Sequence, residues 1–337
     1  MGDGTRIVQE VAAAVGLAEG ERGVRGVIAA LVRLEPVSTR RLSRAAGLPV
    51  PIVASVCGEL RQRAVVAEER PSRLTPAGRA LFAAGGLGGG VATSCPTCAG
   101  RGIVVPARLS RVVADVAQAA AEAPPPVLEL DQCHCTVETK VRRVLALHDA
   151  DALVGRRVLL LGDDDLVALA LGSLVRRLGS AATIASLAVV DLDPAVLAFA
   201  RRRLARARFP VSRVRHDLRE PLPDSLRGRF DTVVTDPPYT VEGARVFLSR
   251  AADALAGGGD VFLSFGSRRP GAAFALQQAI GEMGFVVRRL VRDFNEYVGA
   301  GVLGGTSDLY HLTATEAVRP AVVGRFDGPL YTADARP

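Results

Sequence analysis

The chain has 337 residues, of which 49% are hydrophobic and 23% charged, an ordinary composition for a globular protein. This length predicts two domains, or one domain with an added module. No uninterrupted apolar run reaches about 18 residues, so we expect no membrane-spanning helix. The N-terminal stretch carries acidic residues and no signal-peptide core, which predicts a cytoplasmic protein. Five cysteines in a chain this long do not make a disulfide framework.

The formal net charge is +7, from 42 Lys and Arg against 35 Asp and Glu. Nearly all of the basic residues are arginine. An arginine- and alanine-rich composition is typical of a GC-rich genome, so the charge is weak evidence for a polyanionic partner. We therefore expect no nucleic-acid partner.

Residues 1–84 have the pattern of a small winged-helix-like α+β domain. A first helix stops at a proline, Ser38 caps a second, and a third begins near Val50. Two short strands around a turn and a helix capped by Thr75 complete the order of a helix–turn–helix with a hairpin. The module could bind DNA through the helix after Val50, or it could serve docking or dimerisation. We favour docking, because that helix carries only three charged side chains.

Residues 85–150 are expected to form a linker with helices and two cysteine pairs. Cys95 and Cys98 form a C-x2-C pair, and Cys133 and Cys135 form a C-x-C pair. Four thiolates in this order could close a tetrahedral, structural zinc site. The alternative is reduced, partly buried thiols.

Strand and helix patterns alternate over residues 151–317, and residues 318–337 form an irregular tail. The apolar run Val158–Leu161 predicts a buried parallel strand, Gly162 a tight turn, and the next stretch a helix. Further strands are expected to end at Asp191, near Asp217 and at Thr235, and the helix after Tyr239 to end at a glycine cap. This is the α/β, class I methyltransferase-like Rossmann sheet of about seven strands.

Carboxylates follow the successive strand ends, where ligands of such sheets bind. Asp191 is placed to accept hydrogen bonds from ribose hydroxyls, and Asp217 from the amine of adenine. The alternative for Asp217 is a cap of its own turn. We expect the adenosyl site to be completed by neighbouring residues in the same turns: Gly162, Leu192 and Leu218.

The sequence Asp236-Pro237-Pro238-Tyr239 follows the fourth strand. Two prolines fix the backbone and remove two donors, so carbonyl groups and the Asp236 carboxylate remain as acceptors. Such a site holds an amine and directs its lone pair toward an electrophile. Tyr239 could stack on a base or a sulfonium, or contact an ammonium by a cation–π interaction. The motif therefore indicates an amine nucleophile without specifying which amine.

The turn after the first strand carries three carboxylates, Asp163, Asp164 and Asp165, where nucleotide-binding turns are rich in glycine. They would repel a diphosphate. They would also repel the carboxylate of S-adenosylmethionine, by about 1 kcal/mol even in water at about 4 Å. The decarboxylated form lacks that group and carries two positive charges. Three aspartates also suit a polyamine, from which a carboxylate can take a proton before attack.

Asp131 and Gln132 precede a helix whose N-terminus is expected beside the sheet. That helix could deliver both side chains to the mouth of the pocket.

Several motifs together resemble the branched-chain polyamine synthases, or N4-bis(aminopropyl)spermidine synthases. They are "CPTCAGRG", "DQ" at 131–132, "GDDDL" at 162–166, "VVDLDP" at 189–194, "DLREPLPD" at 217–224, "FDTVVTDPPYT" at 230–240 and "FNEYV" at 294–298. The resemblance covers residues 95 to 300.

This resemblance implies a homodimer that transfers aminopropyl groups from decarboxylated S-adenosylmethionine to spermidine. It implies that an aspartate of the Gly-Asp-Asp-Asp motif activates the amine, which we assign to Asp164 with Asp163 or Asp165 as the fallback. It also implies that Asn295 and Glu296 contact the substrate. The chain departs from the family in its basic charge and its short tail.

Two other functions compete with this interpretation. The first is an amine N-methyltransferase that acts on nucleic acid through the Asp-Pro-Pro-Tyr motif. The second is a non-catalytic DNA-binding regulator that senses a polyamine or an adenosyl ligand. The three aspartates disfavour the first, because they oppose intact S-adenosylmethionine.

Overall fold

A computed structural model describes residues 3–83, 95, 97–98, 100–266, 269–299, 305–332 and 334. The chain divides into two compact units. One comprises Met1–Ser94 with Gly299–Thr306, and the other Cys95–Val298 with Ser307–Pro337. The second unit therefore includes residues 95–150 and the C-terminal segment together with the sheet. No helix in the described ranges has the length and apolar character needed to cross a bilayer.

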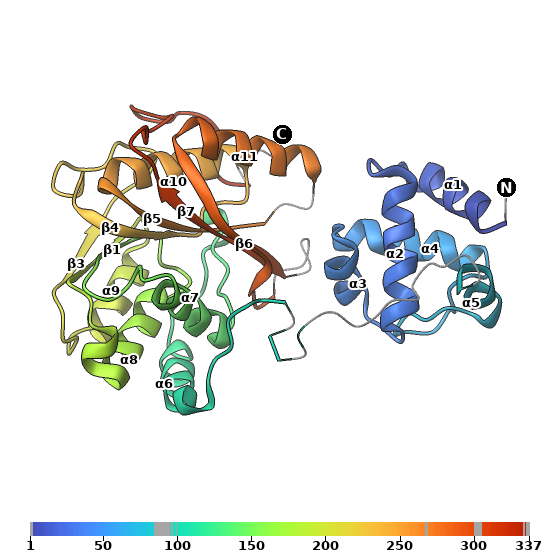
Figure 1. The fold of residues 1–337 in the computed structure, drawn as a ribbon, viewed down its shortest axis with the longest axis horizontal. Helices are drawn as coiled ribbons and strands as arrows, with labels where there is room; N and C mark the ends of the chain where they lie inside the picture. The colour runs from blue at the N-terminus through green and yellow to red at the C-terminus, as the bar shows by residue number, and fades with distance from the viewer. Residues whose placement is uncertain are drawn as a thin grey trace. The chain divides into compact units, whose positions relative to one another are not determined.

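The N-terminal unit is built from helices around its own apolar core (Figure 1). Ser38 caps the third helix by accepting a hydrogen bond from the Arg41 amide, as its sequence position predicts. Thr75 likewise accepts a hydrogen bond from the Gly78 amide at the start of the fifth. The helices are α1 Asp3–Val15, α2 Gly20–Leu34, α3 Thr39–Ala46, α4 Val50–Gln62 and α5 Pro76–Ala83.

The hairpin expected in this unit is reduced to single bridges. Val66 pairs with Leu74, and Val37 with Ser72, both antiparallel. Residues 3–83 contain no longer strand. The winged-helix-like assignment for this unit stays a prediction.

The second unit contains a seven-stranded sheet in the order β3-β2-β1-β4-β5-β7-β6. Strands β1 to β5 pair in parallel, and β7 pairs antiparallel to β5. This is the class I methyltransferase-like sheet that the alternating pattern predicts. The strands are β1 Arg157–Leu161, β2 Ser186–Asp191, β3 Val211–Arg215, β4 Phe230–Thr235, β5 Leu255–Phe265, β6 Phe285–Glu296 and β7 Thr306–Ala314.

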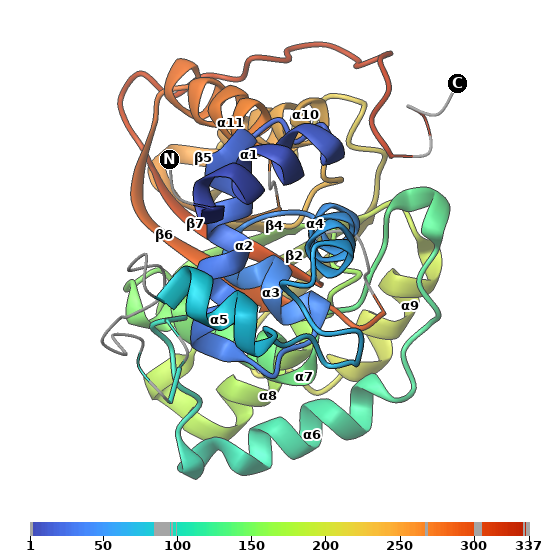
Figure 2. The same ribbon diagram turned by 90° about the vertical axis from the view of Figure 1, so that its right-hand side faces the viewer.

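Helices cover both faces of this sheet. Figure 1 shows α10 and α11 on one face and α6, α7, α8 and α9 on the other, and Figure 2 shows the same layers after a quarter turn. Each face has its own apolar core. The helices are α6 Ser110–Ala120, α7 Val137–Asp149, α8 Val167–Leu178, α9 Pro194–Arg203, α10 Val241–Ala254 and α11 Pro270–Glu282, with 3₁₀ turns at Ala107–Leu109, Leu128–Leu130 and Gly179–Ala182.

The strand register brings the carboxyl ends of three strands together. Leu161 of β1 pairs with Val190 of β2 and with Thr235 of β4. The residues that follow these partners are Gly162, Asp191 and Asp236. The site is therefore built where β1 meets its two neighbours, outside their carboxyl ends.

The prediction that the helix after Tyr239 ends at a glycine cap is wrong. Helix α10 ends at Ala254, and the glycines at 257–259 lie within β5. A Cβ on Gly259 would overlap the Asp231 carbonyl, and the pairing of β4 with β5 shifts register at this place. The glycines thus serve a strand irregularity that helical periodicity does not reveal.

Candidate active site

The turn after β1 is fixed by hydrogen bonds to the end of β2. Gly162 has a φ of +75° and its amide donates to the Val190 carbonyl at 2.8 Å. The Asp163 amide donates to the Asp191 carboxylate at 2.8 Å. The Asp163 carboxylate in turn accepts from the Ala168 amide, in the first turn of α8, at 3.2 and 3.3 Å. Asp163 therefore joins the turn to the helix.

Asp165 is held by a cation from another element. Its carboxylate contacts the Arg143 guanidinium of α7 at 2.6 Å and accepts the Cys135 amide at 2.6 Å. Both side chains are buried, with 2% of Arg143 and 4% of Asp165 exposed. Burial alone would raise the pKa of Asp165, but the charges of Arg143 and Lys140 and the hydrogen bonds from Asp236 and the Cys135 amide together outweigh it, so the pKa lies below its usual range. Asp165 is thus an ionised partner of Arg143.

Arg143 also binds the carboxylate after β4. Its guanidinium donates to Asp236 at 2.7 Å, to the Asn295 side chain at 2.8 Å and to the Tyr297 hydroxyl at 2.9 Å. Burial raises the pKa of Asp236 to about 7, because Asp165 adds to this effect and Arg143 only partly opposes it. One guanidinium therefore joins two carboxylates with different pKa values.

Asp164 differs from both of its neighbours in the turn. Its carboxylate is partly buried and accepts one hydrogen bond, from the Cys133 amide at 3.2 Å. In the described part of the chain it has no ion pair with a cation. Burial, followed by the charges of Asp165 and Asp236, raises the pKa of Asp164 well above its ordinary value. A cation that arrives from outside would meet this carboxylate without displacing a protein partner.

Two phenols form a short relay to Asp236. The Tyr239 hydroxyl donates to the Tyr297 hydroxyl at 2.6 Å, and Tyr297 donates to Asp236 at 2.6 Å. Burial, together with the charge of Asp236, raises the pKa of both tyrosines, so both stay neutral donors. The Tyr239 ring also packs edge-on against Phe265, with ring centroids 5.6 Å apart.

The two prolines of the motif are buried between the strand and α10. The Pro238 carbonyl accepts the Thr240 amide at 2.7 Å, so it closes the turn. A Cβ on Gly243 would approach this carbonyl to 2.6 Å, which explains the glycine there. Pro237 and Pro238 thus hold the backbone that presents Asp236.

The residues predicted to hold the adenosyl group line the ends of β2 and β3. Asp191 accepts the amides of Asp163 and Asp193, each at 2.8 Å, one on each oxygen. Leu192 is partly buried and Leu218 is buried. The Asp217 carboxylate accepts the Arg219 amide at 2.9 Å, which is the turn-capping contact expected as its alternative.

Asp131 and Gln132 support the loop before α7. Asp131, with a φ of +55°, accepts the amide and hydroxyl of Thr332 at 2.7 and 2.9 Å. The Gln132 side chain accepts the Val127 amide at 2.8 Å and donates to Asp193 at 3.3 Å. Asp131 therefore anchors the C-terminal segment, and Gln132 reaches the turn after β2.

Asn295 and Glu296 have different surroundings. Asn295 is fully buried, accepts from Arg143 and donates to the Ser307 hydroxyl at 2.9 Å. Glu296 pairs with Arg101 at 2.7 Å and with Arg142 at 3.6 Å. Asn295 therefore belongs to the network around Arg143, whereas Glu296 belongs to a separate group with two arginines.

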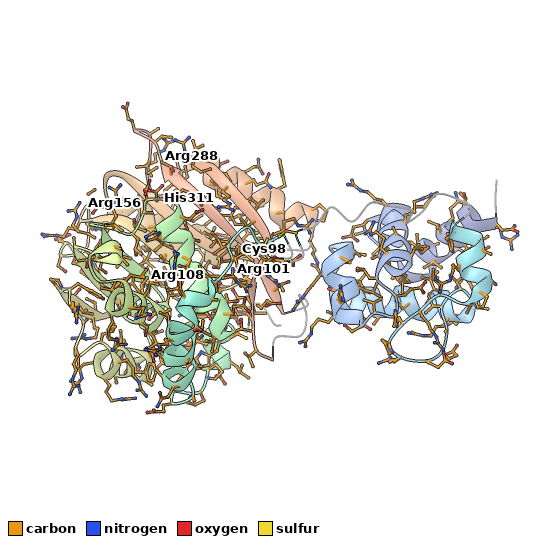
Figure 3. All side chains as sticks on the ribbon, turned by 60° about the horizontal axis from the view of Figure 1, so that its bottom comes forward. Cys98, Arg101, Arg108, Arg156, Arg288 and His311 are labelled. Carbon is orange, nitrogen blue, oxygen red and sulfur yellow. The ribbon has the colours of Figure 1, made fainter. Side chains whose placement is uncertain are left out.

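The described residues contain no group of three or more His, Cys, Asp or Glu side chains that could hold a metal ion. The zinc site expected from Cys95, Cys98, Cys133 and Cys135 therefore stays a prediction. Burial, followed by the charge of Asp165, raises the pKa of the Cys133 thiol to about 11 and also raises that of Cys135. The Cys98 carbonyl accepts the Arg101 amide at 2.9 Å, and Figure 3 shows these two residues near one another.

Sequence reasoning missed two members of the site, Arg143 and Tyr297. Arg143 lies in "TKVRRV" on a helix that precedes the sheet, and only its position among apolar residues hinted that it is buried. Tyr297 is part of "FNEYV", whose neighbours Asn295 and Glu296 were singled out instead. The start of α7 is joined to the end of β6 by a bridge between Cys135 and Tyr297, which brings both into the site.

A doubly wound sheet of this strand order, with buried carboxylates at its carboxyl edge, defines a class I methyltransferase-like transferase fold. The family model for the Branched-chain polyamine synthase A C-terminal domain matches residues 111–317. The chain belongs to the branched-chain polyamine synthase family.

Three comparisons illustrate this membership. An uncharacterised protein of Methanocaldococcus jannaschii is 34% identical over 91% of this chain and 77% of its own length. The N(4)-bis(aminopropyl)spermidine synthase of Thermococcus kodakarensis is 32% identical over 77% of this chain and 73% of its own. The branched-chain polyamine synthase of Thermus thermophilus, solved with N4-aminopropylspermidine and 5′-methylthioadenosine, matches with a TM-score of 0.76 at 24% identity, covering 98% of each chain.

Proposed function

We propose that this chain moves the aminopropyl group of decarboxylated S-adenosylmethionine to a nitrogen of a spermidine-type polyamine. The product is branched, and 5′-methylthioadenosine is released. Relatives named N(4)-bis(aminopropyl)spermidine synthase support the reaction. The observation that carries it for this chain is Asp164, a carboxylate with no cationic partner among the described residues, beside two carboxylates that share Arg143.

The charge balance of the turn favours a donor without a carboxylate. Asp163 is engaged by the first turn of α8 and Asp165 by Arg143, so the repulsion expected from three aspartates rests mainly on Asp164. An intact methionine carboxylate near this turn would meet an unpaired anion of the same sign. That repulsion is about 1 kcal/mol in water at about 4 Å and larger where solvent is excluded. The decarboxylated donor presents an ammonium and a sulfonium instead.

The ends of β2 and β3 suit an adenosyl group. Each Asp191 oxygen accepts one backbone amide and keeps lone pairs for ribose hydroxyls. Gly162 allows the backbone to approach the ligand, and Leu192 and Leu218 supply apolar contact for the adenine. Asp217 retains one oxygen for the adenine amine.

Asp164 is the general base in this proposal. A polyamine nitrogen is protonated at neutral pH and must lose a proton before it attacks. Asp163 and Asp165 both hold structural partners, so neither is as free to take that proton. The raised pKa of Asp164 also brings the proton affinity of its carboxylate closer to that of the amine.

The transfer itself is one displacement. The nitrogen lone pair forms a bond to the propyl carbon next to sulfur, and the carbon–sulfur bond breaks with its electrons going to sulfur. The sulfonium becomes the neutral thioether of methylthioadenosine, and the proton passes from nitrogen to Asp164 and then to solvent. Positioning and charge matching supply most of the rate enhancement.

Asp236 and Tyr239 hold the acceptor in this scheme. The Asp236 carboxylate is fixed by Arg143 and Tyr297, with Pro237 and Pro238 behind it, so it can orient an amine with little rearrangement. The Tyr239 ring offers a face to an ammonium. Asn295 acts through Arg143. Asp131, Gln132 and Glu296 shape the loop and strand end beside the acceptor, and a homodimer is the expected assembly.

The test offers spermidine with either decarboxylated or intact S-adenosylmethionine and weighs the products. We expect mass increases of one or two aminopropyl units with the decarboxylated donor, and stoichiometric methylthioadenosine. Growth of the acceptor by a single methyl with the intact donor would instead establish an amine methyltransferase. A panel of linear polyamines then defines the acceptor.

A further inference from the structure

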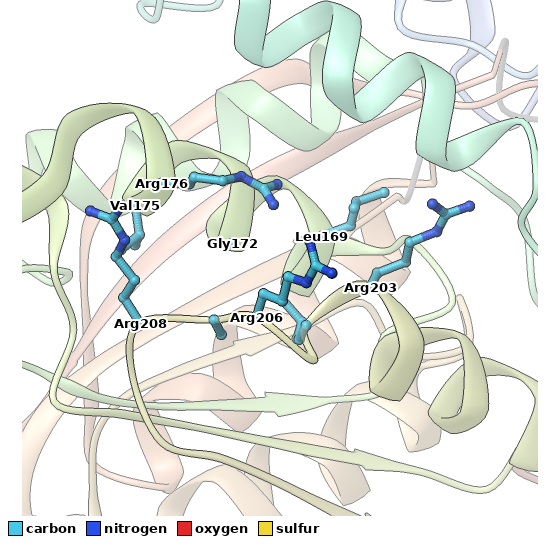
Figure 4. A pocket seen from close by; sticks show the side chains of 9 residues that line it. Leu169, Gly172, Val175, Arg176, Arg203, Arg206 and Arg208 are labelled. Atoms are coloured by element: carbon cyan, nitrogen blue, oxygen red, sulfur yellow. The ribbon is translucent and has the colours of Figure 1, made fainter.

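A second charged feature lies away from the acidic site, on the helices beside β3. A hollow that is open to solvent lies between α8 and the segment that joins α9 to β3. Figure 4 shows four arginine side chains around it, Arg176 from α8 and Arg203, Arg206 and Arg208 from the end of α9 and the loop after it. None of the lining residues is acidic.

These arginines have few protein partners. Arg206 and Arg208 are exposed, and the described chain gives neither an ion pair. Arg176 donates to the Ser173 hydroxyl at 3.3 Å. Arg203 pairs with Glu122 at 2.5 Å, yet its Nε is buried without a hydrogen-bond partner in the described structure. Of these four guanidinium groups, only that of Arg203 has an acidic partner in the described structure.

The positive charge extends beyond the hollow. Nine arginines lie between residues 176 and 215, with only two aspartates, Asp191 and Asp193, in the same stretch. Both aspartates are buried and engaged by backbone amides. Arg213 and Arg215 stand exposed on β3, an outer strand of the sheet. Guanidinium donors are therefore spread over two helices, a loop and a strand. This area is wider than a single phosphate occupies.

We propose that this arginine surface, centred on Arg176, Arg203, Arg206 and Arg208, binds the phosphate backbone of double-stranded nucleic acid. Guanidinium groups match phosphate oxygens with paired hydrogen bonds, and repeated phosphates can engage several of them at once. The sequence alone did not predict this partner, because composition does not reveal where arginines gather. The fold collects them on one face of the second unit.

The side chains of this surface favour a duplex over other polyanionic ligands. Single-stranded nucleic acids are held by stacking on aromatic side chains. Phe199 and Phe209, the aromatic residues of this stretch, are both buried. Amphipathic helices at membrane surfaces insert apolar side chains, and the described residues between 169 and 215 expose no large hydrophobic side chain. Backbone contact to a duplex needs neither feature.

The test measures fluorescence anisotropy of a labelled short DNA duplex with the full chain and no substrates, so it does not depend on the transfer reaction. We expect affinity to fall steeply between about 50 and 200 mM salt. The R206Q/R208Q double variant should bind about tenfold more weakly, and its salt slope should decrease by about two. The matched control is R288Q/R292Q, which removes the same charge from exposed positions on β6 (Arg288 in Figure 3).

We expect the control to retain affinity within about twofold. Equal loss in both double variants would show that net charge alone is responsible and would overturn the proposal. Absence of duplex binding at about 50 mM salt would also overturn it, as would binding only to anionic phospholipid vesicles or to a labelled single strand. If R206Q/R208Q does not fold, the single variant R176Q with the single control R288Q decides the same question.

Discussion

The acidic site and the arginine surface lie in the same unit but hold their charges in different ways. In the acidic site, Asp165 is buried and Asp236 is 12% exposed, and the two share one guanidinium, with contacts of 2.6 and 2.7 Å. On the arginine surface, Arg206 and Arg208 are exposed, and the described chain gives neither an acidic partner. Buried charges depend on geometry, because each loses hydration that only its partner replaces. Exposed charges depend on salt and on external partners.

The difference teaches how each region responds to substitution. A change in the acidic site alters stability, protonation or the reaction, because little solvent reaches these side chains to compensate. A change on the arginine surface leaves the fold intact and alters association only. Four predictions test this contrast, beginning with the largest expected effect.

The first prediction concerns Asp164. Asp164→Asn removes the proposed base while keeping the shape and the hydrogen bond from Cys133. We expect kcat to fall by about 10²–10⁴, measured by methylthioadenosine release at saturating substrates. Asp224→Asn, at a fully exposed aspartate of the same unit, is the control and should retain full activity. Full activity of the Asp164 variant would remove the base assignment.

The second prediction concerns Arg143. Arg143→Met leaves Asp165 and Asp236 buried without their cation, so the free energy of unfolding should fall by about 3–5 kcal/mol. The control is Arg157→Met, which breaks the half-exposed pair with Asp231 and should cost less than about 1 kcal/mol. Both values come from urea denaturation. Similar losses in the two variants would contradict the contrast between buried and exposed charge.

The third prediction concerns pH. Burial raises the pKa of Asp236 from its ordinary 3.8 to about 7 in the folded chain. Between these values the folded state binds a proton that the unfolded state has released, so this group makes stability fall as pH rises through that window. Asp236→Asn should reduce the slope by up to about 1.4 kcal/mol per pH unit.

Denaturation at several pH values measures that slope. The neighbouring Asp163, Asp164 and Asp191 also have raised pKa values, so part of the decline should remain in the variant. Asp165 acts in the opposite sense, and its contribution is lost only at lower pH. An unchanged slope in Asp236→Asn would show that this carboxylate is not protonated in the folded chain.

The fourth and smallest effect is expected on the arginine surface. R206Q/R208Q should change the free energy of unfolding by less than about 0.5 kcal/mol, because surface substitutions away from buried features have little effect. Its kcat should equal that of the unaltered chain. Thermal denaturation and methylthioadenosine release measure the two quantities. A decrease of several kcal/mol in the free energy of unfolding would instead show that these arginines stabilise the fold.

The sequence alone was sufficient to predict the parallel sheet and the carboxylates at the carboxyl ends of its strands. A buried apolar run, Gly162 and the three aspartates predict the first strand, turn and helix, and the structure confirms β1 and α8 there. Parallel strands end at one edge, so Asp191 and Asp236 could be placed beside this turn from order alone. Hydrophobic periodicity and turn-forming residues depend on neighbours in the sequence, so the sequence alone predicts these elements.

Other features depend on contacts between distant segments. Arg143 reaches Asp236, 93 residues further along the chain, and no local pattern marks that pair. Asp163 and Asp165 look equivalent to Asp164 in sequence, yet helix α8 and Arg143 give each a separate role. The arginines of the hollow come together only because the end of α9 passes α8, where Gly172 leaves room for Leu204.

The position of Arg143 also sets where the catalytic unit can begin. Helix α7 precedes β1, so a shorter chain that starts at the first strand would contain every aspartate of the edge but not their shared guanidinium. Its sheet would carry these carboxylates without the guanidinium that helps to keep Asp165 ionised. Excision of a minimal enzyme must therefore keep the segment from Cys135 onward, and the appearance of activity during folding should follow the docking of this helix.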